Sequence, residues 1–192
     1  MGCLNVSGGG VGTANGVQSR SKRKERGMSE GVIKSAVIDP TGMYRYSLSR
    51  KWSDGDMGAW VMLNPSTADA SVDDPTIRRC ISFSKSWGYG GLTVVNLYAY
   101  RATNPDALKT AIDPIGPEHG VHFMRALHAS SLIIAAWGAC KHAKTDHVRP
   151  WLAQRDIQCL GVTADGSPRH PLYVKADVHL REWKLVRPVP HD

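Results

Sequence analysis

Three segments of the chain carry a polar side chain that could bind a ligand or take part in catalysis. Each lies within or after an apolar run that has the composition of a buried strand. Asn64 follows "WVML", Asn96 lies inside "VVNLYAY", and Arg169, His170 and Pro171 follow "GVTADGSP", the loop after the run "IQCLGV". An amide can donate and accept hydrogen bonds, and an imidazole can also transfer a proton near neutral pH. Three such segments in one sheet indicate a functional site.

Each of these residues also has a purely structural explanation. Asn64 followed by Pro65 is typical of a turn that ends a strand, and His170 can be an ordinary loop histidine. Asn96 is harder to explain in this way, because an unpaired amide in a buried run costs about 1–3 kcal/mol. Neighbouring backbone groups could satisfy that amide, so both explanations of Asn96 stay open.

The elements that must position these residues are strands and helices in alternation. We expect strands over "MYRYSLSRKW", "AWVML", "LTVVNL", "SLIIAAWG" and "IQCLGV", the second being the buried pairing partner of the first. Helices are expected over 75–88, after residue 104, over 117–129 and over "AKTDHVRPWLAQ", which Pro150 interrupts. Asp73 or Asp74 is expected to cap the first helix.

This alternation predicts a three-layer α/β/α fold, in which a mainly parallel central sheet is covered on both faces. In such folds ligands bind beyond the carboxyl ends of the strands. Asn64 lies at such an end, and His170 lies in a loop that follows the last of the five expected strands. The predicted fold therefore places the polar segments together, beyond the carboxyl ends of the strands.

Length and composition predict one domain preceded by a basic tail. Residues 1–31 are rich in glycine and serine and contain the run "RSKRKER", so we expect a disordered tail followed by a single α/β domain over 32–192. A net charge of +7 is compatible with nucleic acid but does not demonstrate it. No apolar run approaches the ~20 residues that cross a bilayer. The four cysteines lack the spacing of metal-binding loops. We expect a cytoplasmic monomer without metal, cofactor or membrane association.

Several longer motifs in the sequence resemble those of known protein families. The segments "MLNPSTADASVDDPTIRRC", "WGYGGLTVVNLYAYRAT", "AAWG" and "PRHPLY" resemble an uncharacterised domain family of bacteria and their phages. Their order is also distantly similar to the uracil-DNA glycosylase superfamily. That superfamily has a strand ending in a polar residue and proline, a strand with an internal asparagine, an apolar strand ending in glycine, and a His-Pro loop. The resemblance implies a uracil-DNA-glycosylase-like fold and an enzyme that removes a uracil-like or modified base from DNA.

The resemblance implies a role for each matched residue. Asn64 would position the attacking water, His170 would stabilise negative charge on the departing base, and Asn96 would read the base edge. These roles suit a reaction that leaves an oxocarbenium-like sugar and an anionic base. The predicted catalytic residues are Asn64 and His170, and the predicted substrate-binding residues are Pro65, Ser66, Asn96, Tyr98, Arg101 and Arg169.

One departure from the superfamily pattern concerns the group that would accept a proton from the attacking water. Asn64 cannot accept a proton as a carboxylate would, so the water would be oriented and the chemistry should be slow. One of Asp69, Asp73 and Asp74 could supply the base, whereas their structural roles would be turn formation and helix capping. Candidates for an aromatic residue that stacks on a flipped base are Trp87, Tyr89, Tyr98 and Tyr100.

Other functions fit parts of the same pattern. One is a non-catalytic module that binds nucleic acid or a nucleotide in the same cleft, and another is a hydrolase of free nucleotides. The residues Glu118, His119, His122 and His128 are metal-ligand types at helical spacing, but the sequence fixes no third partner, so we do not expect a zinc site.

Overall fold

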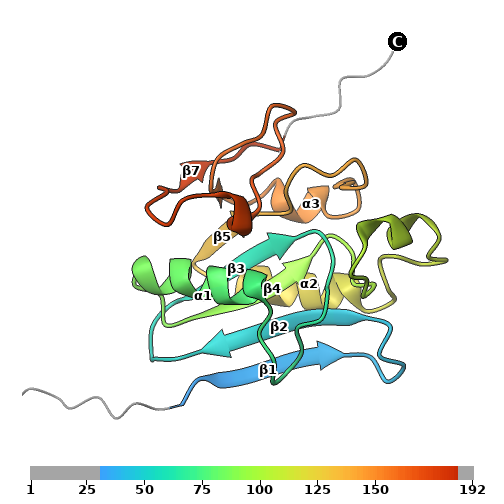
Figure 1. The fold of residues 1–192 in the computed structure, drawn as a ribbon, viewed down its shortest axis with the longest axis horizontal. Helices are drawn as coiled ribbons and strands as arrows, with labels where there is room; N and C mark the ends of the chain where they lie inside the picture. The colour runs from blue at the N-terminus through green and yellow to red at the C-terminus, as the bar shows by residue number, and fades with distance from the viewer. Residues whose placement is uncertain (1–30, 186–192) are drawn as a thin grey trace, which may run out of the picture.

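A computed structural model describes residues 31–185, which form a seven-stranded sheet with helices on both faces (Figure 1). The strands are β1 (Ile33–Ile38), β2 (Arg45–Lys51), β3 (Met57–Met62), β4 (Gly91–Asn96), β5 (Leu132–Ala135), β6 (Ile157–Cys159) and β7 (Arg181–Glu182). The helices are α1 (Pro75–Ser86), α2 (His119–His128) and α3 (Arg149–Leu152), with 3₁₀ turns η1 (Pro105–Lys109) and η2 (Pro171–Tyr173). The tail expected over residues 1–31 lies outside the described range except for Gly31.

The sheet is mixed, with the strand order β1-β2-β4-β3-β5-β6-β7. The pairs β4–β3, β3–β5 and β5–β6 are parallel, whereas β1–β2, β2–β4 and β6–β7 are antiparallel. The expectation of a mainly parallel sheet therefore holds for the four central strands only. A uracil-DNA-glycosylase-like arrangement of this sheet stays a prediction.

The expected pairing of β2 with β3 is wrong, because β4 lies between them. Almost every residue of β3 is buried, so this strand needs a neighbour on each side and a covering layer on each face. In β2 the side chains from 47 onward alternate between buried and partly exposed, which suits a place nearer the edge of the sheet. Alternation predicted β2 and a continuous apolar run predicted β3, but neither pattern fixed which strand pairs with which.

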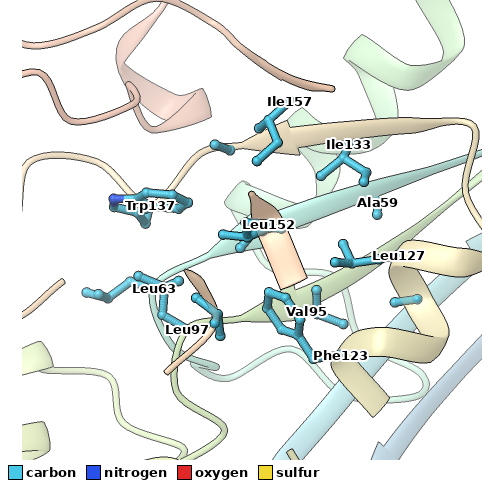
Figure 2. Packing of buried hydrophobic residues seen from close by; sticks show 14 of the residues in the cluster. Ala59, Leu63, Val95, Leu97, Phe123, Leu127, Ile133, Trp137, Leu152 and Ile157 are labelled. Atoms are coloured by element: carbon cyan, nitrogen blue, oxygen red, sulfur yellow. The ribbon is translucent and has the colours of Figure 1, made fainter. Parts of the chain in front are cut away.

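Two apolar clusters lie on opposite faces of the sheet. Odd-numbered β3 residues such as Val61 pack with Phe123 and Leu127 of α2, and Figure 2 shows this cluster. Even-numbered residues such as Trp60 pack instead with Ile77, Phe83 and other residues of α1. Side chains alternate across a strand, so β3 serves both cores. This confirms the expected arrangement of helices on both faces of a central sheet.

Helix α1 begins as expected and resolves which carboxylate caps it. The Asp74 side chain accepts a hydrogen bond from the Ile77 backbone N–H at 2.8 Å, and Pro75 occupies the first turn. Gly88 follows the helix with φ of +82°, a conformation that favours glycine. The expected helix over 75–88 is confirmed to within two residues at its end.

The three remaining helical expectations are confirmed in part. The segment after Asn104 forms the 3₁₀ turn η1, and α2 lies inside the expected 117–129 range. Only Arg149–Leu152 is helical within "AKTDHVRPWLAQ". Pro150 lies in the first turn of α3, because a proline cannot donate to the preceding turn and clashes with it. It therefore starts the helix and does not interrupt a longer one. Within residues 31–185 no helix is both long enough and apolar enough to cross a membrane.

Candidate functional site

The carboxyl ends of the parallel strands surround a cavity of about 400 Å³. Parallel pairing brings the ends of β3, β4 and β5 to one edge of the sheet, and the 163–173 loop closes the cavity. Five predicted site residues line it, namely Asn64, Ser66, Asn96, Arg169 and His170. Three strand-end features that are far apart in the sequence therefore meet in one place.

Asn64 is held by backbone carbonyl groups. Its amide nitrogen donates to the Ala102 carbonyl oxygen at 2.7 Å and to the Pro65 carbonyl oxygen at 3.1 Å. Two carbonyl acceptors fix the amide with its nitrogen toward them, so Oδ1 has no hydrogen bond to any described residue and can accept one from a ligand or water. The structure thus supports both the turn role expected of Asn64 and a free acceptor in the cavity.

Asn96 ends β4 and is only 2% exposed. Its side-chain nitrogen Nδ2 is buried and has no hydrogen-bond partner among the described residues. Its backbone carbonyl accepts from His119 Nε2 at 2.7 Å, which fixes the end of the strand. Backbone groups therefore do not satisfy the Asn96 amide nitrogen, which is a buried donor without an acceptor on a residue of the cavity lining.

His170 presents a defined tautomer when it is neutral. The Leu172 backbone N–H donates to its Nδ1 at 3.3 Å, so the proton of the neutral ring lies on Nε2. Burial lowers the pKa of this imidazole below its ordinary 6.5, and the Asp74 carboxylate opposes that shift. A neutral His170 can therefore donate from Nε2 near neutral pH.

The loop after β5 approaches His170 closely. Gly138 has φ of +78°, and its N–H donates to the Pro168 carbonyl oxygen at 2.8 Å. A Cβ atom at position 138 would lie 3.2 Å from the His170 Cβ. The backbone conformation and this close approach both favour glycine at the end of the apolar run "AAWG".

The other three predicted residues lie outside the cavity lining. Pro65 uses its carbonyl oxygen to hold Asn64 and the Ala102 N–H. Arg101 donates to the Gly42 carbonyl oxygen at 3.2 Å. Tyr98 lines a separate cavity, where its hydroxyl donates to the His142 carbonyl oxygen at 2.7 Å. The structure does not bring Tyr98 to the residues with which it was grouped.

The three carboxylates have different partners. Asp69 accepts from Ser71 and Val72 in a turn, and these bonds lower the pKa of its carboxyl to about 2. Asp73 pairs with the buried Arg50 at 2.7 Å and with Lys34 at 3.0 Å. Among these three carboxylates only Asp74 lines the cavity, so it alone could act as the base.

Sequence reasoning missed two kinds of cavity residue. Arg45 lines the cavity and is 3% exposed, although a charged residue in an alternating strand usually faces solvent. The aromatic residues in the lining are Trp137 and Tyr173, and none of the four expected candidates is among them. Tyr173 immediately follows "RHPL", so its nearness to His170 in the sequence could have identified it.

The described residues contain no cluster of three or more His, Cys, Asp or Glu side chains that could hold a metal ion. His119 points inward to the Asn96 carbonyl, whereas His122 contacts Glu118 at 3.4 Å and stacks on Tyr46. The side chains of His119 and His122 therefore have different partners and do not meet at one point.

The family comparison covers this cavity. A family model described as a protein of unknown function, DUF1643, matches residues 45–172, which is more than half of the chain. The chain belongs to this family. The matched range runs from Arg45 to Leu172 and includes Asn64, Asn96 and His170. No curated protein and no solved structure matches the chain. Neither the DUF1643 match nor the fold links the chain to uracil-DNA glycosylases.

Proposed function

We propose that this DUF1643 protein binds a nucleobase in the 400 Å³ cavity and hydrolyses the N-glycosidic bond that joins the base to its sugar, with DNA as the substrate. The observation that carries the proposal is the meeting of three groups in one cavity. These are the free acceptor of Asn64, the unpartnered donor of Asn96 and the Nε2 donor of His170. The two donors match carbonyl oxygens on a uracil-like ring, and the Asn64 acceptor can hold a water molecule beside the sugar.

The proposed reaction assigns each group one task. Water held by Asn64 Oδ1 attacks C1′ of the sugar as the C1′–N bond breaks, and the bonding electrons leave with the base. His170 donates to an oxygen of the base, where negative charge develops only as the bond breaks. The proton released by water passes through the Asp74 carboxylate to the base. Asp74 uses one oxygen to cap α1, and its other oxygen has no hydrogen bond to the described residues.

A histidine substitution tests this proposal. Oligonucleotides that contain uracil or 5-hydroxymethyluracil are incubated with excess protein, and released base is measured in a single turnover. His170→Ala is expected to lower the rate of base release about 10²–10³-fold, as for loss of one donor to a developing anion. His128→Ala is the matched control, because His128 is exposed at the end of α2. Absence of base release from both oligonucleotides would contradict the glycosylase proposal.

Asn64 favours a second candidate function, a module that binds without catalysis. Its amide cannot accept a proton, and its nitrogen is engaged by two carbonyl oxygens. A binding module would retain the oligonucleotide or nucleotide intact with an affinity that Asn96→Ala weakens. Faster hydrolysis of free nucleotides than of DNA would favour the third function, a nucleotide hydrolase. Measuring both binding and base release, for the oligonucleotides and for free nucleotides, distinguishes the three functions.

A further inference from the structure

The cavity contains a buried positive charge that the proposed reaction does not use. Arg45 is the first residue of β2, and its side chain lines the cavity although the residue is only 3% exposed. One guanidinium nitrogen, Nη1, donates to the Ala68 carbonyl oxygen. Nε is buried and has no hydrogen-bond partner among residues 31–185. A cationic donor group in the cavity wall is therefore only partly satisfied.

Arg50, five residues along the same strand, shows what a neutralised buried arginine looks like here. Arg50 is fully buried, its Nε donates to the Asp73 carboxylate at 2.7 Å, and its other nitrogens donate to backbone carbonyls. In the described part of the chain no carboxylate lies within 4.0 Å of the Arg45 guanidinium. An unpaired buried charge is strongly unfavourable in a protein interior. Arg45 therefore differs from Arg50 because no carboxylate of the described residues pairs with its guanidinium.

More distant charges do not remove this difference. The Asp74 and Asp69 carboxylates act on Arg45 from beyond ion-pair distance, and Arg101 and Arg50 oppose them. Asp74 is engaged as the cap of α1, and Asp69 is engaged in its turn. Burial lowers the pKa of the Arg45 guanidinium to about 10, so the group stays charged at neutral pH. The positive charge is therefore retained in the cavity wall.

A second unsatisfied donor belongs to another residue that lines the same cavity. Asn96 Nδ2 is buried without a partner, and it comes from β4, the strand that pairs with β2. His170 adds a third donor from the 163–173 loop. A wall with several free donors and one uncompensated cation favours an anionic oxygen of a ligand.

We propose that Arg45 and Asn96 form an oxyanion-binding subsite, which binds a negatively charged oxygen of the ligand. Two sources of that oxygen fit the cavity, namely the carbonyl oxygens of an anionic base and the phosphate of a nucleotide. The first source rests on the proposed glycosidic cleavage, whereas the second does not. In the first case Arg45 stabilises the departing base together with His170, and in the second case it positions the phosphate.

Three small probes separate these sources without any need for catalysis. Uracil is a neutral ring, barbituric acid is a related ring that is anionic at neutral pH, and inorganic phosphate is an oxyanion without a ring. Their affinities for the full chain are measured by ligand-observed NMR titration. We expect the preferred anion to bind about 10–100-fold tighter than uracil, as for hydrogen bonds to a charged group. Preference for barbiturate indicates the base, and preference for phosphate indicates a nucleotide.

Two cavity variants and one control test the role of Arg45. Arg45→Met keeps most of the side-chain length and should remove the preference for the anion while leaving uracil affinity within about threefold. Asn96→Asp is nearly isosteric, adds a carboxylate to the cavity, and should also weaken anion binding, which keeps the test valid if Arg45→Met does not fold. Arg125→Gln removes one positive charge from the exposed face of α2 and should change nothing.

The outcomes separate this proposal from the proposed function. If phosphate binds through Arg45 but uracil does not bind at all, the oxyanion subsite is supported and the nucleobase proposal fails. If uracil binds but neither anion binds more tightly, the nucleobase proposal survives and the subsite is refuted. Equal anion affinity in the wild type, Arg45→Met and Arg125→Gln would also refute it.

Discussion

Asn64 and Asn96 are both asparagines at strand ends, but their amide nitrogens are in opposite states. The Asn64 nitrogen has two carbonyl acceptors, whereas the Asn96 nitrogen has none among the described residues. The first amide is therefore a structural clamp between two loops that leaves its oxygen free. The second lacks its partner, and a ligand can supply it. This difference explains why an amide rather than a carboxylate suits position 64, because a carboxylate has no hydrogen to donate.

Asn64→Asp tests that explanation. The substitution places carboxylate oxygens against the carbonyl oxygens of Ala102 and Pro65, so it should lower the free energy of unfolding by about 1–3 kcal/mol at neutral pH. Asn64→Ala removes the same hydrogen bonds without adding a charge, so it should be the less destabilising of the two. Urea denaturation of both variants measures the difference, which should narrow in acid as the carboxyl becomes protonated. An Asn64→Asp protein as stable as Asn64→Ala at neutral pH would contradict the clamp.

At this scale, sequence reasoning identified residues that stand out against an apolar run. Asn64, Asn96 and His170 were found because each is polar beside a buried strand, and the fold brings them to one cavity. Arg45 was missed because the alternation in "MYRYSLSRKW" places it on the same side of the strand as Ser47 and Ser49, the side expected to face solvent. Burial of an arginine depends on the loop that covers it, here the Ala68 segment, and strand periodicity does not include such contacts.

The loop between β3 and α1 is the element that combines stability with the site. It supplies Asn64 and Ser66 to the cavity, and two buried arginines of β2 bind its backbone at Ala68 and Asp69. The acidic residues at its end then separate into an ion pair and a helix cap. The conformation of this loop therefore depends on two buried arginines and the groups that they bind.

Substitution of these carboxylates should rank their contributions. Asp73→Ala leaves the fully buried Arg50 without its carboxylate and should cost about 3 kcal/mol, the low end for breaking a buried pair, because the Asp73 side chain is 16% exposed. Asp74→Ala removes one helix cap and should cost about 1 kcal/mol.

A surface ion pair is the control. Asp54→Ala breaks the pair with Lys51, in which the Asp54 side chain is 96% exposed, and it should change stability by less than about 1 kcal/mol. Chemical denaturation of the three variants measures the order. If Asp74→Ala were more destabilising than Asp73→Ala, the ion pair between Arg50 and Asp73 would not be the main support of this loop.

The elements also show where sequence reasoning stops. Helix α1 was predicted well because its cap, its proline and its terminal glycine are local features. The pairing of β2 with β4 was not, because two residues that pair across the sheet, such as Leu48 and Val94, are far apart in the chain. Alternation identifies a strand but does not identify its neighbours. The cavity edge was predictable only because parallel central strands end on the same side.

For the whole molecule, buried histidines and paired carboxylates make stability depend on pH in two ranges. Burial lowers the pKa of His119, which is 3% exposed, and of His170 below their ordinary value of 6.5. The unfolded chain therefore takes up protons at a higher pH than the folded chain does. Side-chain and backbone hydrogen bonds lower the pKa of Asp165. Hydrogen bonds and the Lys34 and Arg50 charges lower the pKa of Asp73. The stability that these two carboxylates contribute to the folded protein is therefore lost only in stronger acid.

The sign of the histidine effect can be tested by denaturation. The contribution of His119 and His170 is fully present above pH 6.5 and is lost as the pH falls below that value, because only the unfolded state then binds protons. His119→Gln should flatten part of this decline, since a glutamine amide can still donate to the Asn96 carbonyl but does not titrate. Urea midpoints measured at several values between about pH 7.5 and about pH 4.5 give the slope. His128→Gln, at an exposed position, should keep the wild-type slope, and an equal slope in all three proteins would show that His119 is not the buried neutral group that its contacts imply.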